Sequence, residues 1–156
     1  MKVIDWKNEI KEEELKEVSD ALINGKLVIF PTETVYGIGA IATSEDSVSK
    51  IFLAKGRAQD NPLIVHLSST KEIEKYAYIE NDVEKKLIES FMPGPFTLIL
   101  KKKDNIPNNV SGGMDTIGIR IPDNKIANRI LSYNNIAVAA PSANKSGKPS
   151  GTDIKS

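Results

Sequence analysis

The feature that most constrains the fold is the alternation of short apolar runs with amphipathic segments. The runs 27–30, 63–67 and 136–140 have the length of buried strands, whereas 11–24 carries Leu15 and its apolar neighbours on one helical face. Strands that alternate with helices are typical of α/β sheets with helices packed on them. We therefore predict a single α/β domain in which helices cover a twisted sheet.

Local signals add the other elements. Further strands are expected at 1–4, 96–100 and 116–121. Helices are expected to begin at caps on Ser44, at Ser69 as part of a capping box with Glu72, at Asn81 or Asp82, and at Asp123. Pro31 is expected to end the strand 27–30, and the segment 32–42 after it is expected to be a Gly-rich loop or strand-turn. The segment 106–115 is expected to be a loop.

The composition excludes several classes of function. The 156 residues contain 21 Lys and Arg against 21 Asp and Glu, so no global basic field attracts nucleic acid. The triplet Lys101-Lys102-Lys103 is a local candidate for such a patch, although a solvated strand end explains it better. The absence of Cys removes disulfides and thiolate nucleophiles, and a single His argues against a histidine metal site.

No apolar run approaches the length that spans a membrane. The first residues are too acidic and too broken by polar residues for a signal peptide. The sequence therefore predicts a cytoplasmic protein with no membrane partner.

The segment 55–66 is the first of four polar clusters. Lys55 and Arg57 flank Gly56, Asn61 lies in the following turn, and His66 closes the apolar run. A guanidinium fork and an ammonium match phosphate or carboxylate oxygens. The same cations also suit the last turn of any helix, so both interpretations stay open on these residues alone.

The other clusters contain Thr34, then Thr116 with Arg120 on one face of a strand, and finally Ser142 with Asn144 and Ser150. Turn hydroxyls, a surface ion pair or a capped turn would explain each of them separately. Together they supply cations, hydroxyls and amides but no nucleophile–base pair. That set suits a polyanion bound beside a small zwitterion, with both positioned for transfer.

Five ordered motifs carry a resemblance: PTETVYGIGA (31–40), KGRAQDNPLIVH (55–66), MPGPFT (92–97), TIGIRIP (116–122) and APSANKSG (140–147). They resemble the YrdC-like threonylcarbamoyl-AMP synthase family. The resemblance implies a twisted open mixed sheet. It also implies that L-threonine, bicarbonate and ATP give threonylcarbamoyl-AMP and pyrophosphate, for modification of adenosine 37 in tRNA.

The resemblance also implies roles for individual residues. The L-threonine side is Thr34, His66, Arg120 and the backbone near Ala140. The ATP side is Lys55, Arg57, Asn61, Thr116, Ser142 and Ser150, with Asn144 in the same Ser-x-Asn motif. Lys55 and Arg57 would be the catalytic cations that neutralise phosphate charge, with Mg²⁺ accompanying ATP.

Members of that family usually continue with a further helix and strands that complete the site. We therefore expect residues 1–156 to form one YrdC-like domain that lacks this C-terminal continuation. The expected downstream partners are the proteins that transfer the threonylcarbamoyl group to tRNA.

Two alternatives belong to other classes. One is an RNA-binding module of the same fold that binds tRNA or double-stranded RNA, which a salt-dependent RNA affinity would support. The other is a carbamoyl-adenylate domain like those of hydrogenase maturation proteins, which normally lie within much longer chains. Pyrophosphate release that depends on both ATP and threonine would favour the synthase.

Overall fold

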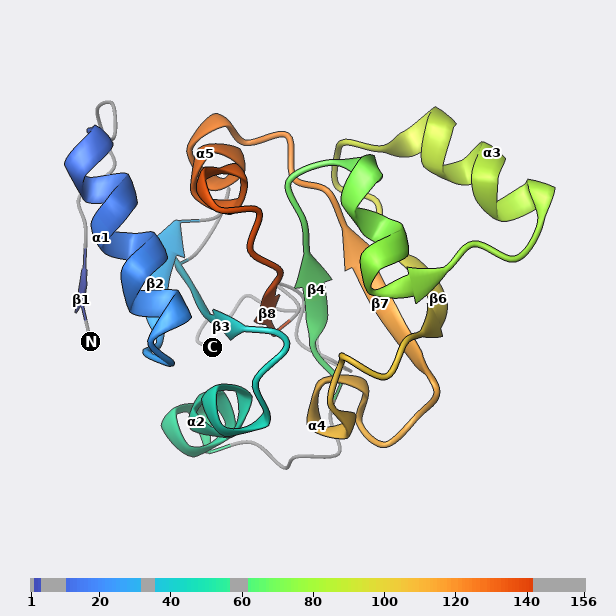
Figure 1. Ribbon diagram of the computed structural model, residues 1–156. Coiled ribbons are helices and arrows are strands. Elements are labelled where there is room, and N and C mark those ends of the chain that lie inside the picture. Colours follow the sequence, from blue (N-terminus) through green and yellow to red (C-terminus); the bar gives the residue numbers. More distant parts are fainter. Residues whose placement is uncertain (1, 4–10, 32–35, 57–61, 142–156) are drawn as a thin grey trace.

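The computed structural model describes residues 2–3, 11–31, 36–56 and 62–141, and in them an eight-stranded sheet carries helices on both faces (Figure 1). The strands are β1 (Lys2–Val3), β2 (Val28–Pro31), β3 (Tyr36–Ile41), β4 (Ile64–His66), β5 (Ala77–Tyr78), β6 (Leu98–Lys102), β7 (Thr116–Arg120) and β8 (Val138–Ala140). The helices are α1 (Glu12–Ile23), α2 (Glu45–Lys55), the 3₁₀ helix η1 (Thr70–Lys75), α3 (Asp82–Phe91), α4 (Asn108–Ser111) and α5 (Lys125–Tyr133).

The sheet is mixed and has the order β1-β2-β3-β8-β4-β7-β6-β5. The pairs β1–β2 and β4–β7 are parallel, whereas the other adjacent strands are antiparallel. This arrangement confirms the predicted twisted mixed sheet with helices packed on it. It also brings strands that are far apart in the sequence, β8, β4 and β7, together in the centre.

Two apolar clusters lie on opposite faces of the sheet. On one face, Leu22 of α1 and Ile130 of α5 pack against Val28 of β2 and Val138 of β8. On the other face, a larger cluster joins residues of α2, η1, α3 and α4 to the buried side chains of the strands, including Val65 of β4. The sheet therefore separates the pair α1–α5 from the other helices.

The central strands show which face is accessible. Burial alternates along β4 and β6, and β7 is buried at its centre and half-buried at both ends. Val65 and Ile119 are fully buried, while His66 and Arg120 are half-buried and Ile99 is 58% exposed. The register pairs His66 with Val138, whose side chain belongs to the α1–α5 cluster. The accessible half of β4, β7 and β6 therefore shares a face with α1 and α5.

Capping residues fix several helix ends. Ser44 accepts a hydrogen bond from the Ser47 N–H at 3.2 Å, and Asn81 accepts one from the Glu84 N–H at 2.9 Å. Gly56 follows α2 in the left-handed conformation, with a φ of 64°, which glycine adopts at little cost. These caps confirm the predicted starts at Ser44 and Asn81.

Other sequence predictions were wrong in detail. Ser69 makes no side-chain capping bond, and the segment after it is a 3₁₀ helix rather than a capped α-helix. The cap of α5 is Asn124, which accepts from the Ala127 N–H at 2.9 Å, not Asp123. The second error arises because Asp123 and Asn124 both adjoin the start of α5 and either residue type can serve as a cap.

The loop and strand boundaries also needed correction. The expected loop 106–115 contains α4, and the expected loop or strand-turn 32–42 contains β3. Pro31 was expected to lie just after the strand but is the last residue of β2. Proline is tolerated there because it lies at the end of the pairing with β3. The strand predicted at 96–100 begins two residues later, at Leu98, and β5 was not predicted at all.

Candidate functional site

The centre of the site is the parallel pair β4–β7. His66 is the register partner of Arg120, and Ile64 is the register partner of Gly118. Because directly paired residues point to the same face of a sheet, His66 and Arg120 lie side by side on the accessible face. The structure thus brings together two of the residues that were predicted to bind L-threonine, although they lie 54 positions apart in the chain.

The Arg120 guanidinium is held on one side only. Its Nη2 donates a hydrogen bond to the Pro95 carbonyl oxygen at 3.2 Å. Its Nε is buried and has no hydrogen-bond partner among the described residues. A buried donor of a cation without an acceptor is costly, so this edge of the guanidinium is suited to an anionic ligand.

His66 is neutral at neutral pH. Burial, and to a smaller extent the neighbouring Arg120 cation, lower the pKa of its imidazole from 6.5 to about 4, against smaller opposite effects of the Val138 and Ile64 backbone. The Nδ1 atom lies 3.2 Å from the Ile64 carbonyl oxygen. A carbonyl can only accept, so this contact favours the neutral tautomer that carries its proton on Nδ1.

Ala140 and Thr116 border the same face. Ala140, the last residue of β8, is the partner of Ile64, which lies two residues before His66. Thr116 begins β7 and is half-buried, four residues before Arg120. Because a strand rises about 3.3 Å per residue, Thr116 and Arg120 lie roughly 13 Å apart along it. Thr116, predicted to bind the nucleotide, and Arg120, predicted to bind L-threonine, therefore occupy opposite ends of one face of β7.

Gly118 separates these two ends. A Cβ atom added there would lie 3.0 Å from Thr97 Cγ2. The Ile99 Cδ1 and Ile64 Cδ1 atoms would lie 3.4 Å and 3.5 Å away. Side chains from both neighbouring strands therefore close over the glycine and form an apolar floor between Thr116 and Arg120.

Lys55 lies toward the opposite end of the central strands from His66 and Arg120. It is the exposed last residue of α2, and Figure 1 shows α2 and α4 at the end of the sheet where β4 and β7 begin. Lys55 and Thr116 are thus both associated with the strand starts, whereas His66 and Arg120 lie at strand ends. Of the remaining predicted site residues, Thr34, Arg57, Asn61, Ser142, Asn144 and Ser150 lie outside the described residues.

The described part of the chain contains no group of three or more His, Cys, Asp or Glu side chains arranged to hold a metal ion. Within the same residues, no helix is long and apolar enough to cross a membrane.

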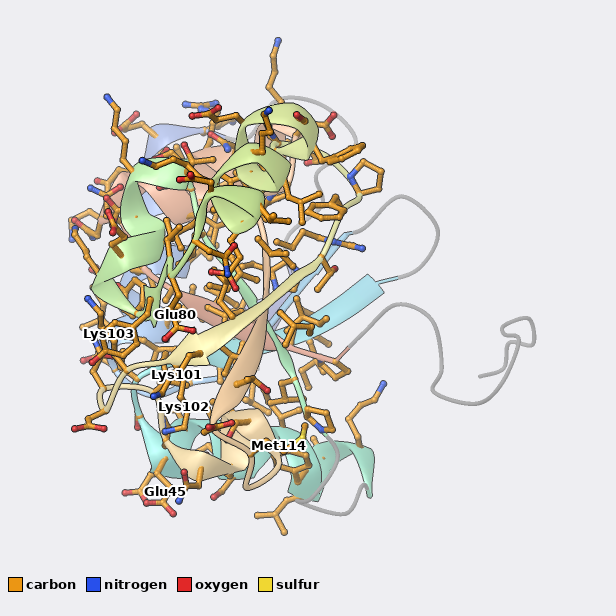
Figure 2. All side chains as sticks on the ribbon, turned by 90° about the vertical axis from the view of Figure 1, so that its right-hand side faces the viewer. Glu45, Glu80, Lys101, Lys102, Lys103 and Met114 are labelled. Atoms are coloured by element: carbon orange, nitrogen blue, oxygen red, sulfur yellow. The ribbon has the colours of Figure 1, made fainter. Side chains whose placement is uncertain are left out.

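The lysine triplet ends β6, as expected for a strand end. Lys102 Nζ donates to the Ile106 carbonyl oxygen at 2.8 Å, and Lys103 Nζ donates to the Glu74 carbonyl oxygen. The Lys103 ammonium also lies 5.0 Å from the centre of the Tyr78 ring. Figure 2 shows the three lysines near Glu80. Two of the three cations are therefore occupied by local contacts instead of forming an open basic surface.

Sequence reasoning missed the contribution of the segment 92–97. Its Pro95 carbonyl binds Arg120, and its Thr97 methyl lies against Gly118. The motif MPGPFT was a sufficient signal that the segment matters. The motif did not indicate what the segment does, because every residue has a main-chain carbonyl and the sequence does not show which carbonyl accepts a hydrogen bond.

Comparison with known proteins identifies the family of the chain. The family model named for Sua5, YciO and YrdC, and described as "Telomere recombination", matches residues 20–156, and the chain belongs to that family. The predicted family resemblance is therefore confirmed.

Two relatives and one solved structure are informative. The chain is 43% identical over 150 residues to the threonylcarbamoyl-AMP synthase of Pyrococcus abyssi, covering 96% of this chain and 44% of the relative. It is 47% identical over 150 residues to a putative threonylcarbamoyl-AMP synthase of Methanocaldococcus jannaschii, covering 94% and 70% respectively. The crystal structure of P. abyssi Sua5 with L-threonine superposes with a TM-score of 0.86 at 42% identity, covering 99% of this chain and 46% of that one. The chain thus spans about half the length of the P. abyssi protein.

Proposed function

We propose that the chain is a nucleotidyltransferase that forms threonylcarbamoyl-AMP and pyrophosphate from L-threonine, bicarbonate and ATP. The observation that carries the proposal is the buried Nε of Arg120, which has no hydrogen-bond partner among the described residues and lies beside neutral His66. A guanidinium edge matches a carboxylate, and a neutral imidazole can accept a hydrogen bond from an ammonium or hydroxyl group. These groups suit an α-amino acid, and the threonine complex of P. abyssi Sua5 supports threonine as that amino acid.

The proposed reaction has two steps. The threonine amine attacks the carbon of bicarbonate, and loss of water leaves a carbamate. A carbamate oxygen then attacks the α-phosphorus of ATP, the bond from that phosphorus to the bridging oxygen breaks, and pyrophosphate leaves with the electron pair. Arg120 and His66 would hold the amino acid in place. The rate enhancement would come from positioning and from stabilising the charge that develops on the phosphates.

The nucleotide would lie toward the starts of the central strands. Thr116 offers a hydroxyl on the same face as Arg120, and exposed Lys55 offers a cation at the end of α2. We assign Arg57, Asn61, Ser142, Asn144 and Ser150 to the same nucleotide side by their motifs. Mg²⁺ commonly binds together with substrate phosphates, so we propose that it enters with ATP.

The product would serve tRNA modification through separate transferase proteins, and the cytoplasm remains the predicted location. Direct binding of tRNA or double-stranded RNA is the weaker candidate. Lys102 and Lys103 are engaged in local contacts, and the chain carries equal numbers of acidic and basic residues. No described feature favours RNA over ATP and threonine.

The test is to incubate the protein with ATP, L-threonine and ¹³C-bicarbonate and to detect threonylcarbamoyl-AMP by mass spectrometry. We expect a product that carries the ¹³C label, depends on all three substrates and accompanies pyrophosphate release. Arg120→Ala, which removes the carboxylate contact, is the internal control and should form much less product. Absence of labelled product, together with absence of threonine and ATP binding by calorimetry, would overturn the proposal.

A further inference from the structure

The segment between α3 and β6 contains the MPGPFT motif, to which the proposed reaction gives no role. Its Pro95 carbonyl oxygen lies 3.2 Å from Arg120 Nη2 and is the only acceptor recorded for that guanidinium among the described residues. The segment therefore contacts the residue that the proposed function needs most, although no side chain of the motif makes the contact.

The Pro95 carbonyl is held in place from two directions. The preceding residue, Gly94, donates its N–H to the Ile121 carbonyl oxygen at 2.8 Å. Three residues after Pro95, Leu98 begins the pairing of β6 with Ile119. The turn is thus anchored to the two residues that flank Arg120 on its own strand.

The rest of the turn is also packed. Gly94 is buried, and the Phe96 ring lies against the Phe91 ring with centroids 5.0 Å apart. Proline fixes its own φ angle, which removes one source of freedom at the carbonyl. The acceptor is therefore preorganised relative to β7.

This contact decides which edge of the guanidinium is free. An arginine side chain has several rotatable bonds, and holding it in one geometry costs conformational entropy unless a neighbour fixes it first. With Nη2 bound to Pro95, the outer end of the guanidinium is anchored, and the buried Nε has no partner in the described part of the chain. The donors left for a ligand are then defined before the ligand arrives.

We propose that the turn 94–97 is a positioning element for Arg120, in which the Pro95 carbonyl orients the guanidinium so that its Nε edge receives the carboxylate of the amino-acid substrate. The inference rests on the proposed function, since that function supplies the carboxylate. Pro95 is a positioning residue and does not touch the substrate itself.

The variant that tests this is Gly94→Ala. Gly94 has a φ of 150°, and a Cβ atom there would lie 3.3 Å from the Phe91 carbonyl oxygen, so alanine must displace the turn that carries Pro95. The matched control is Gly113→Ala, which also places alanine at positive φ, 86°, but with nothing within 4 Å of the new Cβ. Both changes impose backbone strain, and only the first moves the acceptor of Arg120.

The readouts are the dissociation constants for L-threonine and ATP, measured by calorimetry. We expect Gly94→Ala to weaken threonine binding by about 10-fold or more, because small misplacements of a binding group are costly. ATP binding should be unchanged, and Gly113→Ala should match the wild type for both ligands. In an Arg120→Ala background, Gly94→Ala should have no further effect on threonine.

A second readout follows the guanidinium itself. The Arg120 Nε–H resonance in a ¹⁵N NMR spectrum, assigned by its loss in Arg120→Lys, should shift and broaden in Gly94→Ala but not in Gly113→Ala. If Gly94→Ala does not fold, Phe96→Leu, which loses the ring contact with Phe91 but keeps an apolar side chain against the core, takes its place with the same expectations.

The outcomes separate the two proposals. Wild-type protein that binds no threonine overturns the proposed function. Wild-type protein that binds threonine, with an altered Arg120 resonance but unchanged threonine affinity in Gly94→Ala, overturns the positioning role. Equal loss in Gly94→Ala and Gly113→Ala overturns it as well, because general strain would then explain the effect.

Discussion

His66 and Arg120 are register partners on the parallel strands β4 and β7, so an imidazole and a guanidinium lie side by side on one sheet face. Burial, together with the Arg120 cation, keeps the imidazole neutral, and the Pro95 carbonyl binds Nη2 of the guanidinium. The protonation state of His66 and the orientation of Arg120 are therefore set before any ligand binds.

Arg120→Lys should weaken L-threonine binding while ATP binding stays unchanged. Lysine keeps the positive charge but loses the planar fork and the buried Nε donor. The loss of a hydrogen bond between charged groups is expected to cost on the order of 2 kcal/mol. Calorimetric titration of both ligands checks this, and threonine affinity equal to that of the wild type would show that Arg120 is not the carboxylate contact.

The imidazole of His66 should titrate with a pKa of about 4 in the free protein. The chain contains a single His, so its ring signals in an NMR pH titration need no assignment by mutation. A carboxylate bound at Arg120 would offset the cation and should raise this pKa. A free-protein pKa near 6.5 would contradict the burial and the Arg120 contact that the structure shows.

The same shift makes folding stability depend on pH. Since the folded pKa of about 4 lies below the unfolded value of 6.5, the unfolded chain binds the proton first as pH falls. Stability from this residue is therefore full above pH 6.5 and is lost progressively toward pH 4. The whole loss is at most about 3 kcal/mol, because each pKa unit corresponds to about 1.4 kcal/mol.

The control for that dependence is His66→Gln, which has no proton to gain. The free energy of unfolding of both proteins is measured with urea at pH 7 and pH 5. The contribution of carboxylates is common to both proteins and cancels when the two pH dependences are compared. The wild type should lose more stability between the two values than the variant. An equal loss in both proteins would mean that His66 titrates normally.

Asn109→Ala should destabilise the fold by about 1–3 kcal/mol. The buried Asn109 amide donates to the Glu45 carbonyl oxygen at 3.0 Å and to Ser49 Oγ at 3.3 Å, and so ties α4 to the first turns of α2. Its neighbour Asn108 is exposed, and Asn108→Ala is the matched control with an expected effect within about 0.5 kcal/mol. Urea denaturation measures both, and similar values for the two variants would exclude the α2–α4 link as a source of stability.

The sequence predicted the fold where one signal dominated. The apolar face of α1 and the alternation 116–121 gave the correct elements, because periodicity reports burial directly. It failed at α4, which is only four residues long, and at Ser69, where the chain forms a 3₁₀ helix without the expected cap. Short elements depend on tertiary packing, which no local pattern encodes.

The site could be predicted only as a set of residues. Arg120 and His66 were singled out from their motifs, but their adjacency follows from the crossover that places β4 beside β7. The lowered pKa of His66 comes first from burial and then from that adjacency, and both depend on the tertiary fold, so it was not accessible from the sequence. The Pro95 carbonyl was missed because any residue supplies a carbonyl.

Gly118→Ala should destabilise the fold and weaken threonine binding, and the cause can be isolated. The new Cβ would meet Thr97 Cγ2 at 3.0 Å, so Thr97 must move and disturb the floor beside Arg120. Overpacking of this kind typically costs about 1–3 kcal/mol. Thr97→Ser removes that methyl, so the double variant should recover much of the loss, as measured by urea denaturation and calorimetry in a double-mutant cycle. Strictly additive effects of the two substitutions would show that Gly118 is required for a reason other than this contact.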